Sequence, residues 1–354
     1  MLKELFATLS PRLRDRYRNL LADWLGKHLP HGGQLTEVYL RYALGDEYLP
    51  RPLLMLIAYS ADRARVGEPE LAELGNLVFL PQVMRDLLAI HDDVIDEDIE
   101  KFGQPTIPAA FTRLAGGNAK TGRDLAILWS DLLFSLLDDL IDQADLSPEL
   151  GHQLSRVVSR ALRRTQRGQL RELQFQAFAP AAIGPEDLLA MYADKAAEYC
   201  YAAPFELGAV LAGLDPARRH AARAVLEDIG VASQVIDDIA GGCPDMLGHH
   251  KDTRGEILNL RRSLLLVRLA RTLPANHPLT SVLAADRCLP ERVEEVRAAF
   301  VEYGAVRAAA EDACRLARRA AERLDDLRLG PAAREYLHDL LQVRVLDALA
   351  PLTQ

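Results

Sequence analysis

Cysteine is scarce in this chain of 354 residues, and its few cysteines lie far apart. The four, Cys200, Cys243, Cys288 and Cys314, include no CxxC pair. Such spacing provides neither a disulfide framework nor a zinc site. We therefore expect reduced thiols in a cytoplasmic protein.

The sequence also lacks long uncharged apolar runs. A helix that spans a bilayer needs about 20 apolar residues. The run at 53–61 stops at Asp62, and the run at 125–141 is interrupted by aspartates. The N-terminal segment carries charges from Lys3 onward and lacks the apolar core of a signal peptide. We therefore expect no stable insertion into a membrane.

Basic residues are outnumbered by acidic ones. The chain has 42 Lys and Arg against 51 Asp and Glu, and its net charge of −9 is the wrong sign for holding nucleic acid on a general basic surface. With 49% hydrophobic and 26% charged residues, the composition excludes intrinsic disorder. The acidic excess leaves carboxylates that can hold cations.

Strand-like alternation of apolar and polar residues is nearly absent. Apolar residues instead recur three or four positions apart, as at Leu125, Leu128, Leu132 and Leu136, which is typical of amphipathic helices. Glycine and proline cluster between these segments, and no linker is long or polar enough to separate domains. We predict one all-α domain over residues 1–354, built as a single large helical bundle.

The segment at 87–98 joins an apolar helical stripe to a block of acids. At helical spacing Asp92 and Asp96 share one face, and Asp93 lies about 100° round the helix. Like charges in one turn repel one another unless a cation lies between them, and Mg²⁺ commonly bridges carboxylates to substrate phosphates. The segment therefore indicates a magnesium site and a diphosphate substrate, with a solvated helix end as the alternative.

The same DDxxD spacing occurs again at residues 138–142, which run into what looks like a solvated turn. We interpret this second copy as a decoy. The first copy is favoured by its apolar approach, by the turn at 101–106, and by another acidic pair, Asp237 and Asp238, that ends an apolar helix. Two helices that carry carboxylates to a common point could clamp metal ions around one diphosphate.

Taken in order, these motifs resemble the trans-polyprenyl diphosphate synthases, the isoprenoid synthases of the farnesyl and geranylgeranyl diphosphate synthase type. The matching segments are 49–54, 91–96, 103–106, 168–172, 193–197, 207–213, 234–238 and 251–252. The resemblance implies a helical bundle of the isoprenoid synthase type around a deep central cavity, three Mg²⁺ ions with bound diphosphate, an allylic prenyl diphosphate substrate, and a homodimer.

The same resemblance implies roles for individual residues. The expected metal ligands and catalytic acids are Asp92, Asp93, Asp96, Asp237 and Asp238. The expected substrate-binding residues of these motifs are Lys101, Lys195, Lys251 and Gln234, with Lys195 also catalytic. For Lys195 the alternative is an exposed helical lysine. For Gln234 and Gln169 the alternative is a buried amide bonded to backbone.

Leu87 and Leu88 lie one turn before the first aspartate, where the resemblance places residues that set the depth of the cavity. Neither is a bulky aromatic or as small as alanine, so a medium to long prenyl chain is expected, unless both leucines belong to the core. We interpret His91 as a packed or capping histidine without a catalytic role.

The acceptor half of the family's site is altered in this sequence. Tyr48 and Phe102 replace a lysine and an arginine, whereas Arg51 is kept and Arg85 stands where the family has histidine. The two aromatic rings could face a carbocation, an aromatic acceptor or an uncharged tail rather than a second diphosphate. The alternative is that condensation with isopentenyl diphosphate survives on Arg51 and Arg85.

The second acidic motif also departs from the family pattern, because Gly241 stands at its usual closing aspartate. Asp245 or the stretch 252–263 could supply another metal or phosphate contact. The stretch could equally be a polar turn that opens a surface helix. Which of them completes the metal cluster is left open by the sequence.

These expectations combine into one function with two alternatives. We predict a Mg²⁺-dependent trans-prenyltransferase that ionises an allylic prenyl diphosphate and joins the chain to isopentenyl diphosphate or to a non-standard acceptor. The first alternative is a class I terpene cyclase on the same scaffold, which would cyclise a C15–C20 prenyl diphosphate. The second is a non-catalytic partner subunit, against which the intact acidic motif and Lys195 argue.

Overall fold

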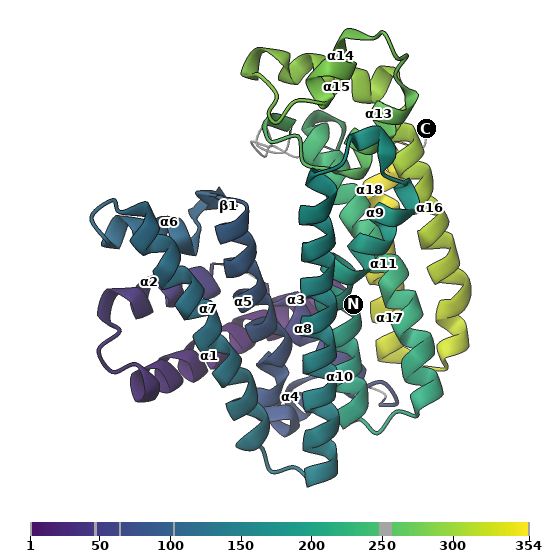
Figure 1. Ribbon diagram of the computed structural model, residues 1–354. Helices are drawn as coiled ribbons and strands as arrows, with labels where there is room; N and C mark the ends of the chain where they lie inside the picture. The colour runs from purple at the N-terminus through teal and green to yellow at the C-terminus, as the bar shows by residue number, and fades with distance from the viewer. Residues whose placement is uncertain (1, 46–47, 64, 102, 248–256, 353–354) are drawn as a thin grey trace. The chain divides into compact units, whose positions relative to one another are not determined.

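The computed structural model describes residues 2–45, 48–63, 65–101, 103–247 and 257–352. Over these ranges the chain is built from helices, with one short hairpin in which β1 (Glu100–Lys101) pairs antiparallel with β2 (Gln104–Pro105) (Figure 1). The prediction of an all-α fold is confirmed.

Short connections join successive helices, as the glycine and proline clusters predict. The first half of the chain contains α1 (Leu2–His28), α2 (Gly33–Ala43), α3 (Pro50–Tyr59), α4 (Glu68–Leu74), α5 (Leu80–Ile95), α6 (Ile107–Leu114), α7 (Ala119–Asp142) and α8 (Pro148–Gln176). The second half contains α9 (Pro185–Tyr192), the π-helix η3 (Ala193–Ala202), α10 (Ala203–Leu211), α11 (Pro216–Gly242), α13 (Leu264–Thr272), α14 (Pro278–Leu283), α15 (Val293–Glu302), α16 (Ala305–Leu324), α17 (Pro331–Leu341), the π-helix η7 (Gln342–Leu346) and α18 (Asp347–Leu349). Short 3₁₀ turns are η1 (Gly75–Phe79), η2 (Pro180–Ala182), η4 (Pro244–Leu247), η5 (Pro290–Arg292), η6 (Asp325–Leu327) and η8 (Ala350–Leu352).

Contacts between Cα atoms group the chain into two compact units. Unit 1 consists of Met1–Arg160, Ala203–Arg219 and Leu329–Tyr336, and unit 2 consists of Ala161–Ala202, His220–Arg328 and Leu337–Gln354. Helices α8, α11 and α17 each supply residues to both units. The single domain over residues 1–354 and its deep central cavity stay predictions.

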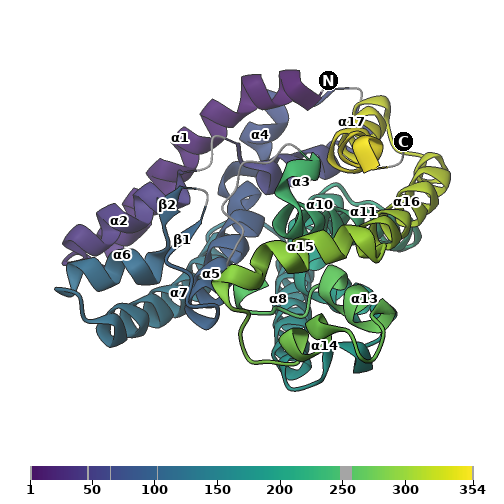
Figure 2. The same cartoon turned by 90° about the horizontal axis from the view of Figure 1, so that it is seen from above.

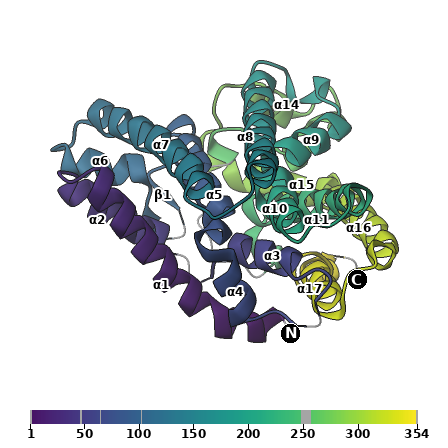
Figure 3. The ribbon, with the colours of Figure 1, turned by 90° about the horizontal axis from the view of Figure 1, so that it is seen from below.

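Helix α5 carries the first acidic motif and is firmly held in unit 1. Its apolar side chains Val83, Leu87 and Ile90 are fully buried, and it packs against α7, with α6 alongside (Figure 3). Ser130 of α7 donates its hydroxyl to the carbonyl of Leu87 at 2.8 Å. Apolar packing and this hydrogen bond together fix the position of α5 along α7.

Helices α3 and α10 approach each other closely in unit 1. A Cβ atom at Gly208 would overlap the carbonyl oxygen of Met55 and lie 2.8 Å from the backbone nitrogen of Tyr59. Residues 52–58 of α3 are all buried, so this apolar run is part of the protein core. Among the described residues, none of the helices combines the length and apolar character needed to cross a membrane.

Unit 2 is organised around α11, α13 and α16. Helix α16 buries an alanine stripe at helical spacing that includes Ala309, Ala313 and Ala317. Helix α13 packs against α16, where Arg268 forms an ion pair with the buried Asp312. Within this unit, α13, α14 and α15 lie together at one end, at the top in Figure 1, and Figure 2 shows them from above.

The π-helix η3 is held in unit 2 by two glycines and by buried charge. A Cβ atom at Gly168 of α8 would lie 2.5 Å from the backbone nitrogen of Lys195, and one at Gly230 of α11 would lie 2.5 Å from the Cβ of Ala197. Arg164 of α8 pairs with Asp194 and Glu198 of η3, each at 2.9 Å. π-Helical turns are rare and are frequently found at functional sites, and Lys195 lies in one of them. Its functional role stays a prediction.

Candidate active site

The first acidic motif lies at the C-terminal end of α5. The helix ends at Ile95, Asp96 is its cap residue, and Glu97 follows with a φ of 55° in the left-handed region. This change of direction leads the chain into the β1–β2 hairpin. Asp92 and Asp93 therefore stand in the last turn of the helix, where Asp93 is buried and Asp92 is half-buried.

Lys101 of β1 places its ammonium group among these carboxylates. Its Nζ atom lies 3.0 Å from Asp92 Oδ2, 2.6 Å from Asp93 Oδ1 and 3.2 Å from Asp98 Oδ2. Burial lowers the pKa of Lys101, but the neighbouring carboxylates outweigh burial and the pKa is raised overall. The structure thus brings together three residues that the sequence predicts for one site, with Lys101 in its charged form.

Asp93 provides the observation that bears on metal binding. Its Oδ2 atom is buried and accepts no hydrogen bond from the described residues. Burial raises the pKa of Asp93 to about 6, although Lys101 opposes the rise. Mg²⁺ takes one or two carboxylates and completes its coordination with water and phosphate oxygens, so a buried carboxylate oxygen of this kind fits it. Across the described ranges, no three or more His, Cys, Asp or Glu side chains are grouped as a ready-made metal cage.

The second acidic pair lies near the C-terminal end of α11, in unit 2. Asp237 is exposed and Asp238 is buried. The Asp238 carboxylate accepts hydrogen bonds from the Tyr192 hydroxyl, from Gln234 Nε2 at 3.1 Å and from the backbone N–H of Leu264 at 3.1 Å. Burial raises the pKa of Asp238 to about 6 against these donors. Asp238 therefore ties α11 to the first residue of α13, and metal binding by this pair and substrate binding by Gln234 stay predictions.

Lys195 of η3 is paired with Glu172 of α8 through its Nζ atom. Its side chain is 23% exposed, so it is not a fully solvated helical lysine. Gln169 lies one turn before Glu172, and its Nε2 atom is buried without a hydrogen-bond partner among the described residues. The structure thus gathers Lys195, Glu172 and Gln169 in one part of unit 2.

The residues predicted for the acceptor half lie partly outside the described ranges, since Phe102 and Lys251 are not among the described residues. Tyr48 is 46% exposed, and its ring stands edge-on to Phe6 with the ring centroids 5.2 Å apart. Arg51 is half-buried in the first turn of α3. Tyr48 therefore lies at the surface of unit 1, outside its core, and the roles of these residues stay predictions.

Arg85 belongs to a buried polar group that the sequence analysis missed. Its Nη1 atom donates to Asp86 Oδ1 at 3.1 Å, and its guanidinium lies 5.3 Å from the centroid of the Tyr42 ring. Asp86 is fully buried and also accepts hydrogen bonds from the hydroxyls of Tyr17 and Tyr39. Burial raises the pKa of Asp86, and its charged and hydrogen-bonded neighbours oppose the rise. The sequence signal that could have revealed this buried polar group is the adjacent Arg85 and Asp86 within an otherwise apolar helical segment.

The two leucines before the acidic motif differ in burial. Leu87 is fully buried and belongs to the core, whereas Leu88 is half-buried on the same face of α5 as Asp92. The role of either leucine in setting the depth of a cavity stays a prediction. His91 Nε2 lies 3.5 Å from Asp131 Oδ1, and burial lowers the pKa of His91, in agreement with a packed histidine.

The second copy of the DDxxD spacing belongs to the packing of α7 in unit 1. Asp139 Oδ2 accepts a hydrogen bond from Trp24 Nε1 at 2.6 Å and lies 3.8 Å from His28 Nε2. These contacts agree with its interpretation as a decoy. Of the segments considered for completing the metal cluster, Asp245 is exposed in η4, and the stretch 252–263 is described from residue 257 onward.

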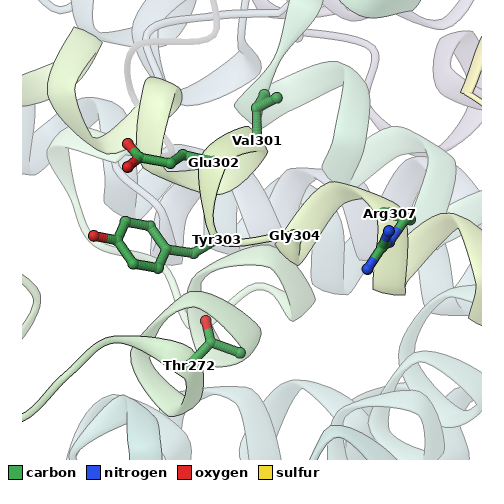
Figure 4. Close-up of a pocket in the computed structure, with 6 residues that line it drawn as sticks. All are labelled: Thr272, Val301, Glu302, Tyr303, Gly304 and Arg307. Atoms are coloured by element: carbon green, nitrogen blue, oxygen red, sulfur yellow. The ribbon is translucent and has the colours of Figure 1, made fainter.

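Two hollows of the described surface lie in unit 2. One has a volume of about 410 Å³ and is lined by Thr272, Val301, Glu302, Tyr303, Gly304 and Arg307 (Figure 4). The other has a volume of about 660 Å³ and is lined by residues of α9, η3, α11 and α16. Neither is lined by a predicted site residue, so the candidate site rests on the side-chain clusters described above.

Curated proteins with similar sequences are prenyl diphosphate synthases. The (2E,6E)-farnesyl diphosphate synthase of Mycobacterium tuberculosis is 31% identical over 200 residues, which are 56% of this chain and 50% of that protein. A short chain isoprenyl diphosphate synthase of Methanocaldococcus jannaschii is 22% identical over 247 residues, 69% of each chain. The chain therefore spans about half the length of the mycobacterial relative that it matches.

Solved structures with the same helical fold cover nearly the whole chain. A geranylgeranyl pyrophosphate synthase from Corynebacterium glutamicum, complexed with isoprenyl diphosphate and magnesium, has a TM-score of 0.83 at 21% identity and covers 94% of this chain and 97% of that one. A geranylgeranyl pyrophosphate synthetase from Pyrococcus horikoshii has a TM-score of 0.74 at 23% identity and covers 97% of this chain and 98% of that one. Residues 39–300 match the Polyprenyl synthetase family. The resemblance drawn from the motifs is confirmed, and the chain belongs to the polyprenyl synthetase family.

Proposed function

We propose that this protein is a Mg²⁺-dependent prenyltransferase that ionises an allylic prenyl diphosphate and transfers the prenyl chain to an acceptor. One observation carries the proposal: Asp92 and Asp93 surround the Lys101 ammonium, and a buried Asp93 oxygen accepts no hydrogen bond from the described residues. The family supports the same chemistry, because its similar members are named as farnesyl and geranylgeranyl diphosphate synthases.

The reaction explains why the site needs these residue types. Breaking the C–O bond of an allylic diphosphate leaves the electron pair on the diphosphate and a carbocation on the prenyl chain. The departing polyanion must be stabilised, and water must be kept from the cation. Asp92, Asp93 and Asp96 would hold Mg²⁺, which when bound supplies Lewis-acid stabilisation of the leaving group.

Each unit supplies one lysine that is a candidate for direct hydrogen bonds to a diphosphate, Lys101 in unit 1 and Lys195 in unit 2. Lys101 is in its charged form among the carboxylates, and an ammonium group offers three N–H donors. Lys195 is oriented by its ion pair with Glu172 and by the glycine contact to η3. Donors that are already oriented do not have to reorganise during the reaction, which is the main source of electrostatic catalysis.

A terpene cyclase is the second candidate function. A cyclase needs no cationic site for a second diphosphate, because double bonds of its own substrate capture the cation. The observation in favour of this candidate is the ion pair between Arg85 and the buried Asp86, which compensates one of the acceptor-side cations.

Product analysis separates these functions. The protein is incubated with Mg²⁺ and allylic diphosphates of C10 to C20, with and without isopentenyl diphosphate. A chain-elongated diphosphate supports an ordinary synthase, and hydrocarbon or alcohol products without added acceptor support a cyclase. Absence of diphosphate release from every allylic substrate, with or without candidate acceptors, contradicts the proposed function.

We further propose a homodimer. The supporting observation is that Ile127 and Leu128, adjacent on α7, are 40% and 66% exposed and offer apolar surface to a second copy of the chain. Light scattering coupled to size-exclusion chromatography tests the proposal, and a monomer at micromolar concentration contradicts it.

A further inference from the structure

One face of α8 holds the π-helix η3 and its lysine, Lys195, within unit 2. Arg164, Gly168 and Glu172 follow one another at intervals of four residues, so they lie along the same face of α8. Glu172 pairs with the Lys195 Nζ atom, and a Cβ atom at Gly168 would lie 2.5 Å from the Lys195 backbone nitrogen. This face therefore holds both the ammonium group and the backbone of Lys195, and Arg164 stands one turn nearer the start of α8.

Arg164 binds two acids of η3 that lie on either side of Lys195 in the sequence. Its Nε atom lies 2.9 Å from Asp194 Oδ1, and its Nη1 atom lies 2.9 Å from Glu198 Oε2. Asp194 directly precedes Lys195, and Glu198 follows Lys195 by three residues. A planar guanidinium can contact two carboxylates at once in a fixed geometry, which a point-like ammonium group does not reproduce. Arg164 thus fixes η3 before and after Lys195.

The charges of this cluster are largely withdrawn from water. The Glu198 side chain is fully buried, that of Asp194 is 7% exposed and that of Arg164 is 21% exposed. Arg223 of α11 also pairs with Glu198. Arg167 of α8 also pairs with Asp194. Because a buried carboxylate is costly unless it is paired, loss of Arg164 would weaken the support of both acids together.

The winding of η3 makes these ion pairs important for the direction of Lys195. Asp194 and Glu198 both lie inside the π-helical segment Ala193–Ala202. Its hydrogen bonds join residues five apart instead of four, and such turns are rare, so tertiary contacts are needed to maintain them. A return to α-helical winding would change the direction of the Lys195 side chain relative to both acids. The contacts of Arg164 therefore oppose a change that would turn Lys195.

We propose that Arg164 is a positioning residue for Lys195, because it holds Asp194 and Glu198 and, through them, the π-helical winding that directs the Lys195 ammonium to a bound diphosphate. This inference rests on the proposed function, in which Lys195 donates hydrogen bonds to a diphosphate. In this role Arg164 needs no contact with the substrate. Its effect on diphosphate binding should therefore depend on the presence of Lys195.

A double-mutant cycle on diphosphate binding tests the inference. The affinity of the full chain for inorganic diphosphate is measured by calorimetry with Mg²⁺, a readout that needs no turnover. Lys195→Gln removes a charged donor and should weaken binding roughly tenfold or more. Arg164→Met should weaken binding by a similar factor. The double variant should stay within about twofold of Lys195→Gln alone, because residues that act as one unit are not additive.

Arg163→Met is the matched control, because it removes the same charge at the neighbouring position of α8. Arg163 is exposed and forms no ion pair with the part of the chain that the structure describes. The affinity of this control should stay within about twofold of the wild type. If Arg164→Met fails to fold, as judged by its thermal melt, Arg164→Lys replaces it in the cycle, since lysine keeps the charge and loses the planar fork.

Three outcomes overturn the inference. The first is wild-type affinity in either single variant, and the second is a double variant in which the two single losses multiply, as for a merely structural role of Arg164. The third is a wild type that does not bind inorganic diphosphate. A failure of the proposed function would appear separately, as absence of diphosphate release from allylic substrates by a wild type that binds inorganic diphosphate.

Discussion

Asp93 and Asp139 occupy the second aspartate of two segments with the same DDxxD spacing, yet their surroundings differ. Asp93 Oδ2 is buried and no described donor reaches it, whereas Asp139 Oδ2 accepts the indole N–H of Trp24 at 2.6 Å. Both segments follow apolar helical stripes, so spacing could not separate them. The difference comes from Trp24, which lies 115 positions away in the sequence.

Asp93→Asn should lower the rate of diphosphate release by roughly 10²-fold or more, because the site loses a charged ligand for the cation that stabilises the leaving group. The rate is measured at saturating Mg²⁺ with an allylic diphosphate. Asp139→Asn is the control and should retain the wild-type rate, since an amide oxygen still accepts from Trp24. Equal losses in the two variants would contradict the assignment of the first motif.

Asp238 makes stability depend on pH. Burial raises its pKa in the folded protein from 3.8 to about 6. Between these values the folded protein holds a proton that the unfolded chain has lost, so the contribution of Asp238 to stability is full below pH 3.8 and is lost as the pH rises to 6. Relative to the wild type, Asp238→Asn should gain roughly 2 kcal/mol as the pH rises through this interval.

Denaturant titrations of both proteins at pH 4 and 6.5 measure that gain. Asp138→Asn, at an exposed position of α7, should show no pH-dependent difference beyond about 0.5 kcal/mol. A constant difference between Asp238→Asn and the wild type at the two pH values would show that Asp238 has no raised pKa in the folded protein.

At the scale of elements, periodicity in the sequence predicted the helices. It did not predict which helices approach each other most closely. The approach of α3 to α10 at Gly208 and the π-helical turns of η3 against Gly168 depend on which helices become neighbours. The sequence around a helical glycine does not show whether that glycine faces solvent or the backbone of another helix. Periodicity therefore located the helices and left these contacts undetermined.

Gly208→Ala should lower the free energy of unfolding by roughly 2 kcal/mol or more, because its methyl group would overlap the Met55 carbonyl oxygen. Chemical denaturation measures the change. Gly26→Ala in α1 is the control, since its Cβ would meet nothing within 4 Å and alanine favours helix by about 1 kcal/mol. The packing argument is wrong if both substitutions stabilise the protein.

The whole molecule belongs to the polyprenyl synthetase family, and its two acidic segments lie in different units of the chain, Asp92 to Asp96 in unit 1 and Asp237 with Asp238 in unit 2. An alternation of helix and turn, without any long linker, is compatible with either one domain or two. Contacts across the sequence, such as those that join Ala203–Arg219 to unit 1, are what define the units.

Mg²⁺ together with inorganic diphosphate should raise the melting temperature, because ligands that bind only the folded protein stabilise it. Each alone should have a smaller effect, since the carboxylates need the cation and the cation binds more tightly with phosphate oxygens. Scanning calorimetry measures the shift. Asp93→Asn should lose most of it and Asp139→Asn should keep it. A full shift in Asp93→Asn would remove Asp93 from the metal site.

The sequence by itself determined the all-α class and the family and predicted the chemistry of the acidic motifs, because helical periodicity, charge and motif order are local properties of the chain. Its motifs also identified candidate site residues, namely Arg85, Asp92, Asp93 and Lys101. Only the tertiary structure decided that Lys101 lies among the carboxylates and that Asp86 compensates Arg85. These charges interact through space, and their effect depends on burial and on partners such as Tyr17 and Tyr39 that folding brings from distant helices.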